Sequence, residues 1–131
     1  MYRLVIVFIS LIFLTACSAN TRADEEPEDV MSITISPSQA RAWMESYSNV
    51  VVLDVRTAEE FATGYIRRAI SLPIDEISTR AQHVLPDKDA LILVYCRSGV
   101  RSLNAAWLLI DMGYTRVYDI GGIIDWPYGT V

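Results

Sequence analysis

The chain has 131 residues, a net charge of −5 and hydrophobic side chains at 52% of its positions. Residues 31–131 carry 9 basic and 11 acidic side chains, a balance that excludes the dense basic surface of a nucleic-acid-binding domain. A segment of that length suits one domain with one modest hydrophobic core, which we expect to be monomeric.

The first 17 residues carry the pattern of an export signal. A positive start that ends at Arg3 precedes eleven residues, 4–14, that are apolar apart from Ser10, and small residues follow before Cys17. A helix of eleven residues is about 16 Å long, well short of a hydrocarbon core of roughly 30 Å, so a secretory signal is favoured. The tetrad LTAC resembles a bacterial lipoprotein box, which implies that residues 1–16 are removed and Cys17 is lipidated. An uncleaved anchor helix and an ordinary signal peptide are the alternatives.

Residues 17–30 are expected to be the lipid anchor and an acidic linker. This segment carries five acidic side chains against Arg22 and has almost no large apolar side chain, so it cannot bury a core. A solvated spacer is favoured over a binding tail. The domain is therefore expected in the bacterial envelope, anchored by lipid and facing the periplasm. Ser18, the residue after the lipidated position, resembles the residue that directs lipoproteins to the outer membrane, so the outer membrane is the expected location.

The first half of the domain predicts two strands and two capped helices. A short strand is expected over 32–35, before a helix with Ser36 as its N-cap, Pro37 in its first turn and Gln39 in a capping box. Its apolar stripe consists of Ala40, Trp43, Met44 and Tyr47. A continuous apolar strand follows over 50–55, and Thr57 and Glu60 form a second capping box that opens a short helix closed by Gly64.

The second half alternates in the same way. A strand is expected over 69–73, a helix over 74–85 that Pro86 stops, a buried strand over 91–95 and a last strand over 116–120. The longest helix precedes Gly113, and its stripe consists of Leu103, Ala106, Trp107 and Ile110. This alternation predicts an α/β domain with a mainly parallel sheet, whose ligands bind beyond the carboxyl ends of the strands.

Cys96 follows the strand over 91–95 and therefore stands at that edge. A free thiol is mostly protonated at neutral pH, but a sulfur before a helix faces unpaired N–H groups and the positive end of the helix dipole. Gly99 allows successive N–H groups to converge in an anion nest, and Arg101 can turn its guanidinium toward the same point. The pattern predicts a thiolate nucleophile beside a cradle for an anionic substrate.

The sequence around this cysteine allows three other interpretations. A small structural cysteine at a strand end is the simplest, but with Cys17 lipidated the thiol has no partner for a disulfide, and an envelope protein has reason to keep it only for chemistry. A phosphatase loop is one residue longer than the four residues between Cys96 and Arg101. A cysteine protease needs a histidine, and His83 stands among polar residues typical of a surface.

Four segments in this order resemble the rhodanese-like sulfurtransferase family, and the match covers residues 33–126. They are ISPSQA, LDVRTAEEFATGYIRRAISLP, YCRSGVRS around Cys96, and GGIIDW near the end. The resemblance implies a five-stranded α/β fold and transfer of a sulfane sulfur from an anionic donor such as thiosulfate to cyanide or a thiol. The carrier would be a persulfide on Cys96, without metal or organic cofactor.

The resemblance also assigns roles to the loop. Cys96 and Arg101 would be catalytic, and the substrate cradle would consist of Arg97, Ser98, Gly99 and Val100. Asp54 and Arg56 are expected first as an ion pair that supports nearby loops and second as substrate contacts. Glu60 is expected to cap a helix. The alternative function is a non-catalytic tethered module that binds, carries or senses persulfides or a protein partner.

Overall fold

The computed structural model describes residues 32–131, so the predicted signal, Cys17 and the whole linker lie outside the described residues. The described elements in chain order are α1 (Pro37–Ser46), β1 (Val51–Asp54), α2 (Ala58–Ala62), β2 (Ala69–Ser71), η1 (Ile74–Glu76), α3 (Ile77–Val84), β3 (Leu91–Cys96), α4 (Val100–Asp111), β4 (Arg116–Gly122) and η2 (Ile123–Asp125). None of the helices within 32–131 has the length and apolar character to span a membrane.

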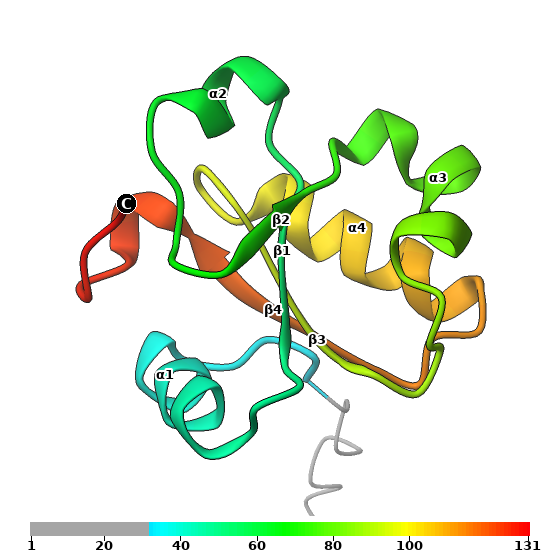
Figure 1. The fold of residues 1–131 in the computed structure, drawn as a ribbon, viewed down its shortest axis with the longest axis horizontal. Coiled ribbons are helices and arrows are strands. Elements are labelled where there is room, and N and C mark those ends of the chain that lie inside the picture. Colours follow the sequence, from blue (N-terminus) through cyan, green and yellow to red (C-terminus); the bar gives the residue numbers. More distant parts are fainter. Residues whose placement is uncertain (1–31) are drawn as a thin grey trace, which may run out of the picture. The chain divides into compact units, whose positions relative to one another are not determined.

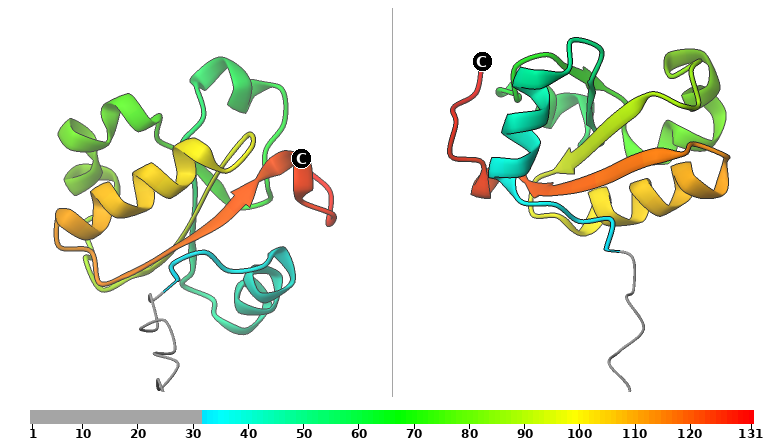
Figure 2. Two further views of the ribbon diagram at one scale, coloured as in Figure 1. Left: turned by 180° about the vertical axis from the view of Figure 1, so that it is seen from behind. Right: turned by 90° about the horizontal axis from the view of Figure 1, so that it is seen from below.

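The sheet has the strand order β2-β1-β3-β4, and every pair in it is parallel. The buried side chains divide into two clusters, one on each face of the sheet. Helices α3 and α4 cover one face and α1 covers the other, as the views from the front, behind and below show (Figures 1 and 2). This arrangement confirms the α/β class and the parallel sheet.

The expected fifth strand over 32–35 is reduced to a single bridge, so the described sheet has four strands. Thr34 pairs in parallel with Asp119 of β4, through Ile35 N–H to the Asp119 carbonyl (2.9 Å) and Asp119 N–H to the Ile33 carbonyl (2.8 Å). The pairing cannot continue, because Ser36 is already the N-cap of α1 and Pro37 has no N–H to donate to a ladder.

The two predicted caps differ in outcome. At α2 both halves of the capping box are present, since Thr57 Oγ1 accepts from Glu60 N–H (3.1 Å) and Glu60 Oε2 accepts from Thr57 N–H (2.9 Å). At α1 Ser36 Oγ accepts from Gln39 N–H at 3.1 Å, and Ser36 alone makes the cap.

The prediction of the buried face of α4 was wrong by one position along the helix. The side chains that α4 buries are Ser102, Ala105, Ala106 and Leu109, whereas Leu103 and Trp107 are 37% and 46% exposed. Hydrophobicity alone favoured Leu103 and Trp107, but the helix rotates so that its small residues contact the sheet. This rotation carries Ser102 inward, beside Cys96.

The alternation of β3 decides where the thiol points. All six residues of β3 are buried. Ile92, Val94 and Cys96 belong to the core cluster under α3 and α4, whereas Leu93 and Tyr95 belong to the cluster under α1. Cys96 is the last residue of the strand, so its sulfur lies against the start of α4 rather than over the open edge of the sheet.

Candidate active site around Cys96

The loop from Cys96 to α4 folds back on the sulfur. Cys96 is fully buried, and its Sγ accepts a hydrogen bond from Gly99 N–H at 3.0 Å. Gly99 has φ of +102°, the left-handed region that favours glycine, and it is the N-cap residue of α4. The glycine therefore makes the turn that aims an N–H group at the sulfur, as the sequence predicted.

Opposing effects act on the ionisation of the thiol. Burial raises the pKa of Cys96, because it removes water from the thiolate. Hydrogen bonds from the Ser102 hydroxyl and from the N–H groups of Ser102, Gly99 and Ser98 lower it and together outweigh burial, so the net pKa is lowered. The cradle therefore favours negative charge on the sulfur.

Arg101 contacts an acid rather than the sulfur. Its two terminal nitrogens lie 2.8 Å from the two carboxylate oxygens of Glu60, the residue that also completes the cap of α2. This ion pair lowers the pKa of Glu60 to about 2, through Arg101 first and the Thr57 N–H second. The sequence predicted that the Arg101 guanidinium faces the thiol and that Glu60 only caps a helix. The structure joins the two residues and so ties α2 to the first turn of α4.

The charge of Arg101 still acts on the loop. Its pKa is raised mainly by Glu60, with smaller contributions from Cys96 and Asp54. The guanidinium thus lies within electrostatic reach of the sulfur while Glu60 holds its position. Arg97, the other cation of the loop, is exposed to solvent, as is Ser98.

Asp54 and Arg56 form the ion pair that the sequence led us to expect. Arg56 Nη2 lies 2.7 Å from Asp54 Oδ2, and the exposed fractions of the two side chains are 5% and 0%. The same nitrogen donates to the Gly64 carbonyl at 2.7 Å, and the guanidinium lies over the Tyr95 ring. The pair therefore fixes the end of β1 to the segment after α2.

The end of β4 presses against the active-site loop. A Cβ built at Gly122 would lie 2.7 Å from Ser98 Cα and 2.8 Å from the carbonyl carbon of Arg97, closer than real side chains approach a backbone. Ile124 N–H also donates to the Arg97 carbonyl at 3.3 Å. The absence of a side chain at Gly122 is what allows the loop to pack here.

A buried polar chain leads away from the sulfur and was not anticipated from the sequence. Ser102 Oγ lies 3.5 Å from Cys96 Sγ and donates to Asp119 Oδ1 at 2.6 Å. Ser102 is fully buried and Asp119 is 3% exposed. One signal was available: Asp119 is the charged residue inside an otherwise apolar run of the last strand, where an acid needs polar partners.

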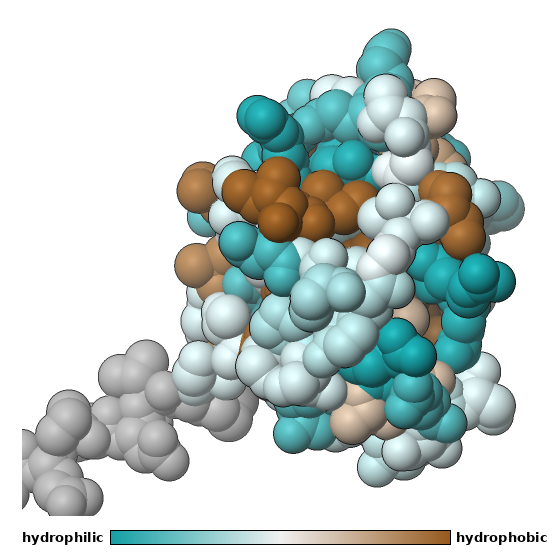
Figure 3. Space-filling view, turned by 90° about the vertical axis from the view of Figure 1, so that its left-hand side faces the viewer, coloured by the Kyte–Doolittle hydropathy of each residue, from teal (hydrophilic) through white to brown (hydrophobic). Residues whose placement is uncertain are grey.

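The outer surface near the loop is partly apolar. Val100, the first residue of α4, and Ile124 in η2 are 69% and 64% exposed. On the face of the molecule that contains the C-terminal end of the chain, hydrophobic residues form a band across a more polar surface (Figure 3).

His83, the one histidine of the sequence, is exposed in the last turn of α3 and forms no part of the loop around Cys96.

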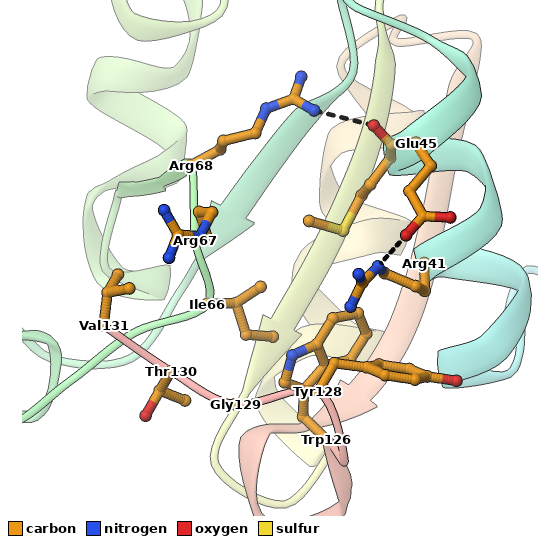
Figure 4. A pocket seen from close by; sticks show the side chains of 11 residues that line it. Arg41, Glu45, Ile66, Arg67, Arg68, Trp126, Tyr128, Gly129, Thr130 and Val131 are labelled. Carbon is orange, nitrogen blue, oxygen red and sulfur yellow. Dashed lines mark hydrogen bonds and ion pairs between the residues drawn. The ribbon is translucent and has the colours of Figure 1, made fainter.

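A cavity of about 440 Å³ lies elsewhere. Helix α1, the segment before β2 and the C-terminal tail line it, with Arg41, Ile66, Arg67 and Trp126 among its residues (Figure 4). Cys96 and its loop do not contribute to it. The N–H groups that face Cys96 therefore lie outside this cavity.

Comparison with known proteins places these features in a family. The family model of the rhodanese-like domain matches residues 36–127. A sulfurtransferase of Allochromatium vinosum is 42% identical over 79 residues, which cover 60% of this chain and 72% of the relative. The thiosulfate sulfurtransferase PspE of Escherichia coli is 37% identical over 73 residues, 56% of this chain and 70% of the relative.

A solved structure gives the same result for the fold. The structure described as rhodanese with anions from E. coli superposes with a TM-score of 0.59 and 34% sequence identity. The superposition covers 63% of this chain and 96% of that structure.

Proposed function

The chain belongs to the rhodanese-like domain family, and from that premise we propose that it is a sulfurtransferase that carries a sulfane sulfur on Cys96. The observation that carries the proposal is the hydrogen bond from Gly99 N–H to Cys96 Sγ at 3.0 Å, in a loop that lowers the pKa of the thiol. Two relatives named as sulfurtransferases support the same class of reaction.

The loop supplies what such a reaction needs. A thiolate at Cys96 attacks the outer sulfur of thiosulfate, the S–S bond of the donor breaks, and sulfite leaves with the electron pair. The product is a persulfide whose terminal sulfur carries the negative charge, which the N–H groups of Ser98 and Gly99 are placed to hold. Cyanide or an acceptor thiolate then attacks that terminal sulfur and regenerates the Cys96 thiolate.

Positive side chains near the loop favour the approach of an anionic sulfur donor to the Cys96 thiolate. Arg97 is exposed beside the loop, where it is free to approach an incoming donor, and Arg101 is held by Glu60 within electrostatic reach of the sulfur. Fixed charges that need no reorganisation stabilise a transition state more than mobile ones do. We therefore propose that Arg97 meets the donor and that Arg101 supplies a fixed positive field.

The proposal is tested by mass and by turnover. The full chain is prepared with Cys17→Ser so that Cys96 is its only thiol, incubated with thiosulfate and weighed intact. We expect a gain of about 32 Da, the mass of one sulfur, that cyanide removes, and no gain in a variant that also carries Cys96→Ser. Absence of the gain in the wild-type loop would contradict the proposal.

Turnover separates the enzyme from its alternative. A persulfide that forms but passes to neither cyanide nor thiols would indicate a module that carries or senses sulfur. Thiocyanate production with repeated cycles is the expected result, since the terminal sulfur lies next to the exposed residues Arg97 and Ser98.

A further inference from the structure

The cavity of about 440 Å³ between α1 and the C-terminal tail has walls that other contacts hold in place. Tyr65 and Val131 exchange two backbone hydrogen bonds of 2.9 Å each, which fix the end of the tail beside the segment before β2. The Trp126 and Tyr128 rings pack edge to face with their centroids 5.0 Å apart, and the Arg41 guanidinium lies over the Tyr128 ring. The cavity is therefore preformed, and its volume lies in the range of small-molecule sites.

The charged side chains around this cavity are mostly cationic. Among the described residues three arginines line it, Arg41, Arg67 and Arg68, together with one acid, Glu45. Arg41 Nε donates to Glu45 Oε1 at 2.6 Å, so this acid is already paired. The terminal nitrogens of Arg68 donate to three backbone carbonyls of residues 44–50. An excess of positive charge therefore remains at the cavity.

Two hydrogen-bond donors of the lining have no acceptor within the part of the chain that the structure describes. They are the guanidinium of Arg67, which is exposed, and the indole N–H of Trp126, and Figure 4 shows neither a hydrogen bond nor an ion pair to them. The indole nitrogen lies on the side of its ring toward Ile66 (Figure 4). A guanidinium and an indole N–H donate and do not accept, so both groups call for a ligand that carries acceptors.

Apolar surface lies beside these donors. Met44, Ile66 and the ring of Trp126 line the same cavity. An indole favours stacking with a second flat ring, and the planar fork of an arginine matches the two oxygens of a carboxylate. A ligand with both features uses the two kinds of surface at once.

We propose that this cavity binds a small aromatic acid, whose ring packs on Trp126 and whose carboxylate accepts hydrogen bonds from Arg67. An inorganic anion would gain nothing from the apolar wall. A neutral aromatic molecule would leave the guanidinium without a partner. Binding therefore depends on ring and charge together.

This site is separate from the loop around Cys96. None of residues 96–101 lines the cavity. The short helix η2 connects the two places: Ile124 N–H donates to the Arg97 carbonyl at 3.3 Å, and Trp126 N–H donates to the Ile123 carbonyl at 3.1 Å. Binding in the cavity requires no sulfur transfer, so its test has an outcome of its own, whatever the reaction at Cys96.

The test measures the binding of 2-naphthoate to the full chain with Cys17→Ser by isothermal titration calorimetry. We expect saturable binding at one site. Two matched probes, 2-naphthamide, which has nearly the same shape without the charge, and acetate, which has the charge without the ring, should each bind at least about tenfold more weakly. A hydrogen bond to a charged group contributes a factor of about ten or more to affinity. No saturable binding of 2-naphthoate, or equal binding of the acid and the amide, would overturn the proposal.

Three variants locate the charge that the acid meets. Arg67→Met should weaken 2-naphthoate binding by about tenfold and leave the fold intact, because the guanidinium has no partner among residues 32–131. Arg116→Met, at an exposed arginine that begins β4 outside the cavity, is the matched control and should bind like the unaltered chain. Arg97→Met should also bind normally. Loss of binding in Arg97→Met with full binding in Arg67→Met would place the anion at the Cys96 loop and refute the site.

A second measurement finds the ring of the ligand without any change at Arg67. The chain has three tryptophans, Trp43, Trp107 and Trp126, and therefore three indole N–H resonances in a ¹⁵N-labelled sample. Trp126→Phe and Trp107→Phe identify the signals by the one that each variant loses. We expect 2-naphthoate to shift the Trp126 resonance most, since a stacked ring and a nearby carboxylate both act on that N–H group. A largest shift at Trp107, on the exposed side of α4, would contradict the proposal.

Discussion

Gly122→Ala isolates the contact by which β4 positions the active-site loop. Gly122 has φ of −105°, an extended conformation open to any residue, so alanine adds a methyl group without backbone strain. That methyl group would lie 2.7 Å from Ser98 Cα and 2.8 Å from the Arg97 carbonyl carbon, both backbone atoms of the loop. The Arg97 carbonyl oxygen would lie closer still, so the loop must move outward or β4 must shift.

Overpacking of this kind costs about 1–3 kcal/mol, and we expect a loss in that range in the free energy of unfolding measured in urea. Because the displaced atoms carry the N–H groups that face Cys96, the variant should also react more slowly with thiosulfate and with iodoacetamide at neutral pH. Gly99→Ala is the contrasting variant: its methyl group meets nothing closer than 3.5 Å, but its φ of +102° is unfavourable for alanine. A Gly122→Ala protein with wild-type stability and wild-type rates would refute the reasoning.

The remaining predictions concern the two ion pairs around the loop. Arg56→Met leaves the Asp54 carboxylate, 0% exposed, without its guanidinium, and should lower the free energy of unfolding in urea by about 3–5 kcal/mol; a loss below about 1 kcal/mol would contradict a structural role. Glu60→Gln removes a carboxylate whose pKa is lowered to about 2, so the stability that it contributes is complete above its ordinary value of 4.5 and lost as the pH falls through about 2. Since both partners are partly exposed, we expect a deficit of about 1 kcal/mol at neutral pH that closes near pH 2, and a deficit that is equal at both pH values would count against the pair.

Several features of this domain follow from short stretches of sequence. The alternation of apolar strands with capped helices predicted a parallel α/β sheet, because hydrophobic period and helix caps depend on residues within a few positions of one another. The turn at Gly99 and the placement of Cys96 at the carboxyl end of a buried strand are local in the same sense. The sequence likewise predicted the capping box that Thr57 and Glu60 form at the start of α2.

The sequence could not decide which of two partners a side chain contacts, or which face of a helix is buried. Arg101 reaches either the sulfur or an acid, and the choice of Glu60 depends on α2 lying beside α4 although the residues are 41 positions apart. The apolar stripe of α4 predicted Leu103 and Trp107 inside, but the close contact of the helix with the sheet admits the smaller side chains. The strand expected over 32–35 shrank to one bridge for a local reason instead, since Ser36 and Pro37 begin α1 directly after it.

The sequence by itself determined the class of fold and predicted Cys96 as a nucleophile at the carboxyl edge of the sheet, because each depends on the periodicity or spacing of neighbouring residues. Tertiary structure alone decided that Ser102 faces inward, that Asp119 lies at hydrogen-bonding distance from it, and that Gly122 closes on the loop. These contacts join residues from different strands and helices. They depend on strand register and helix rotation, which the packing of the whole core sets.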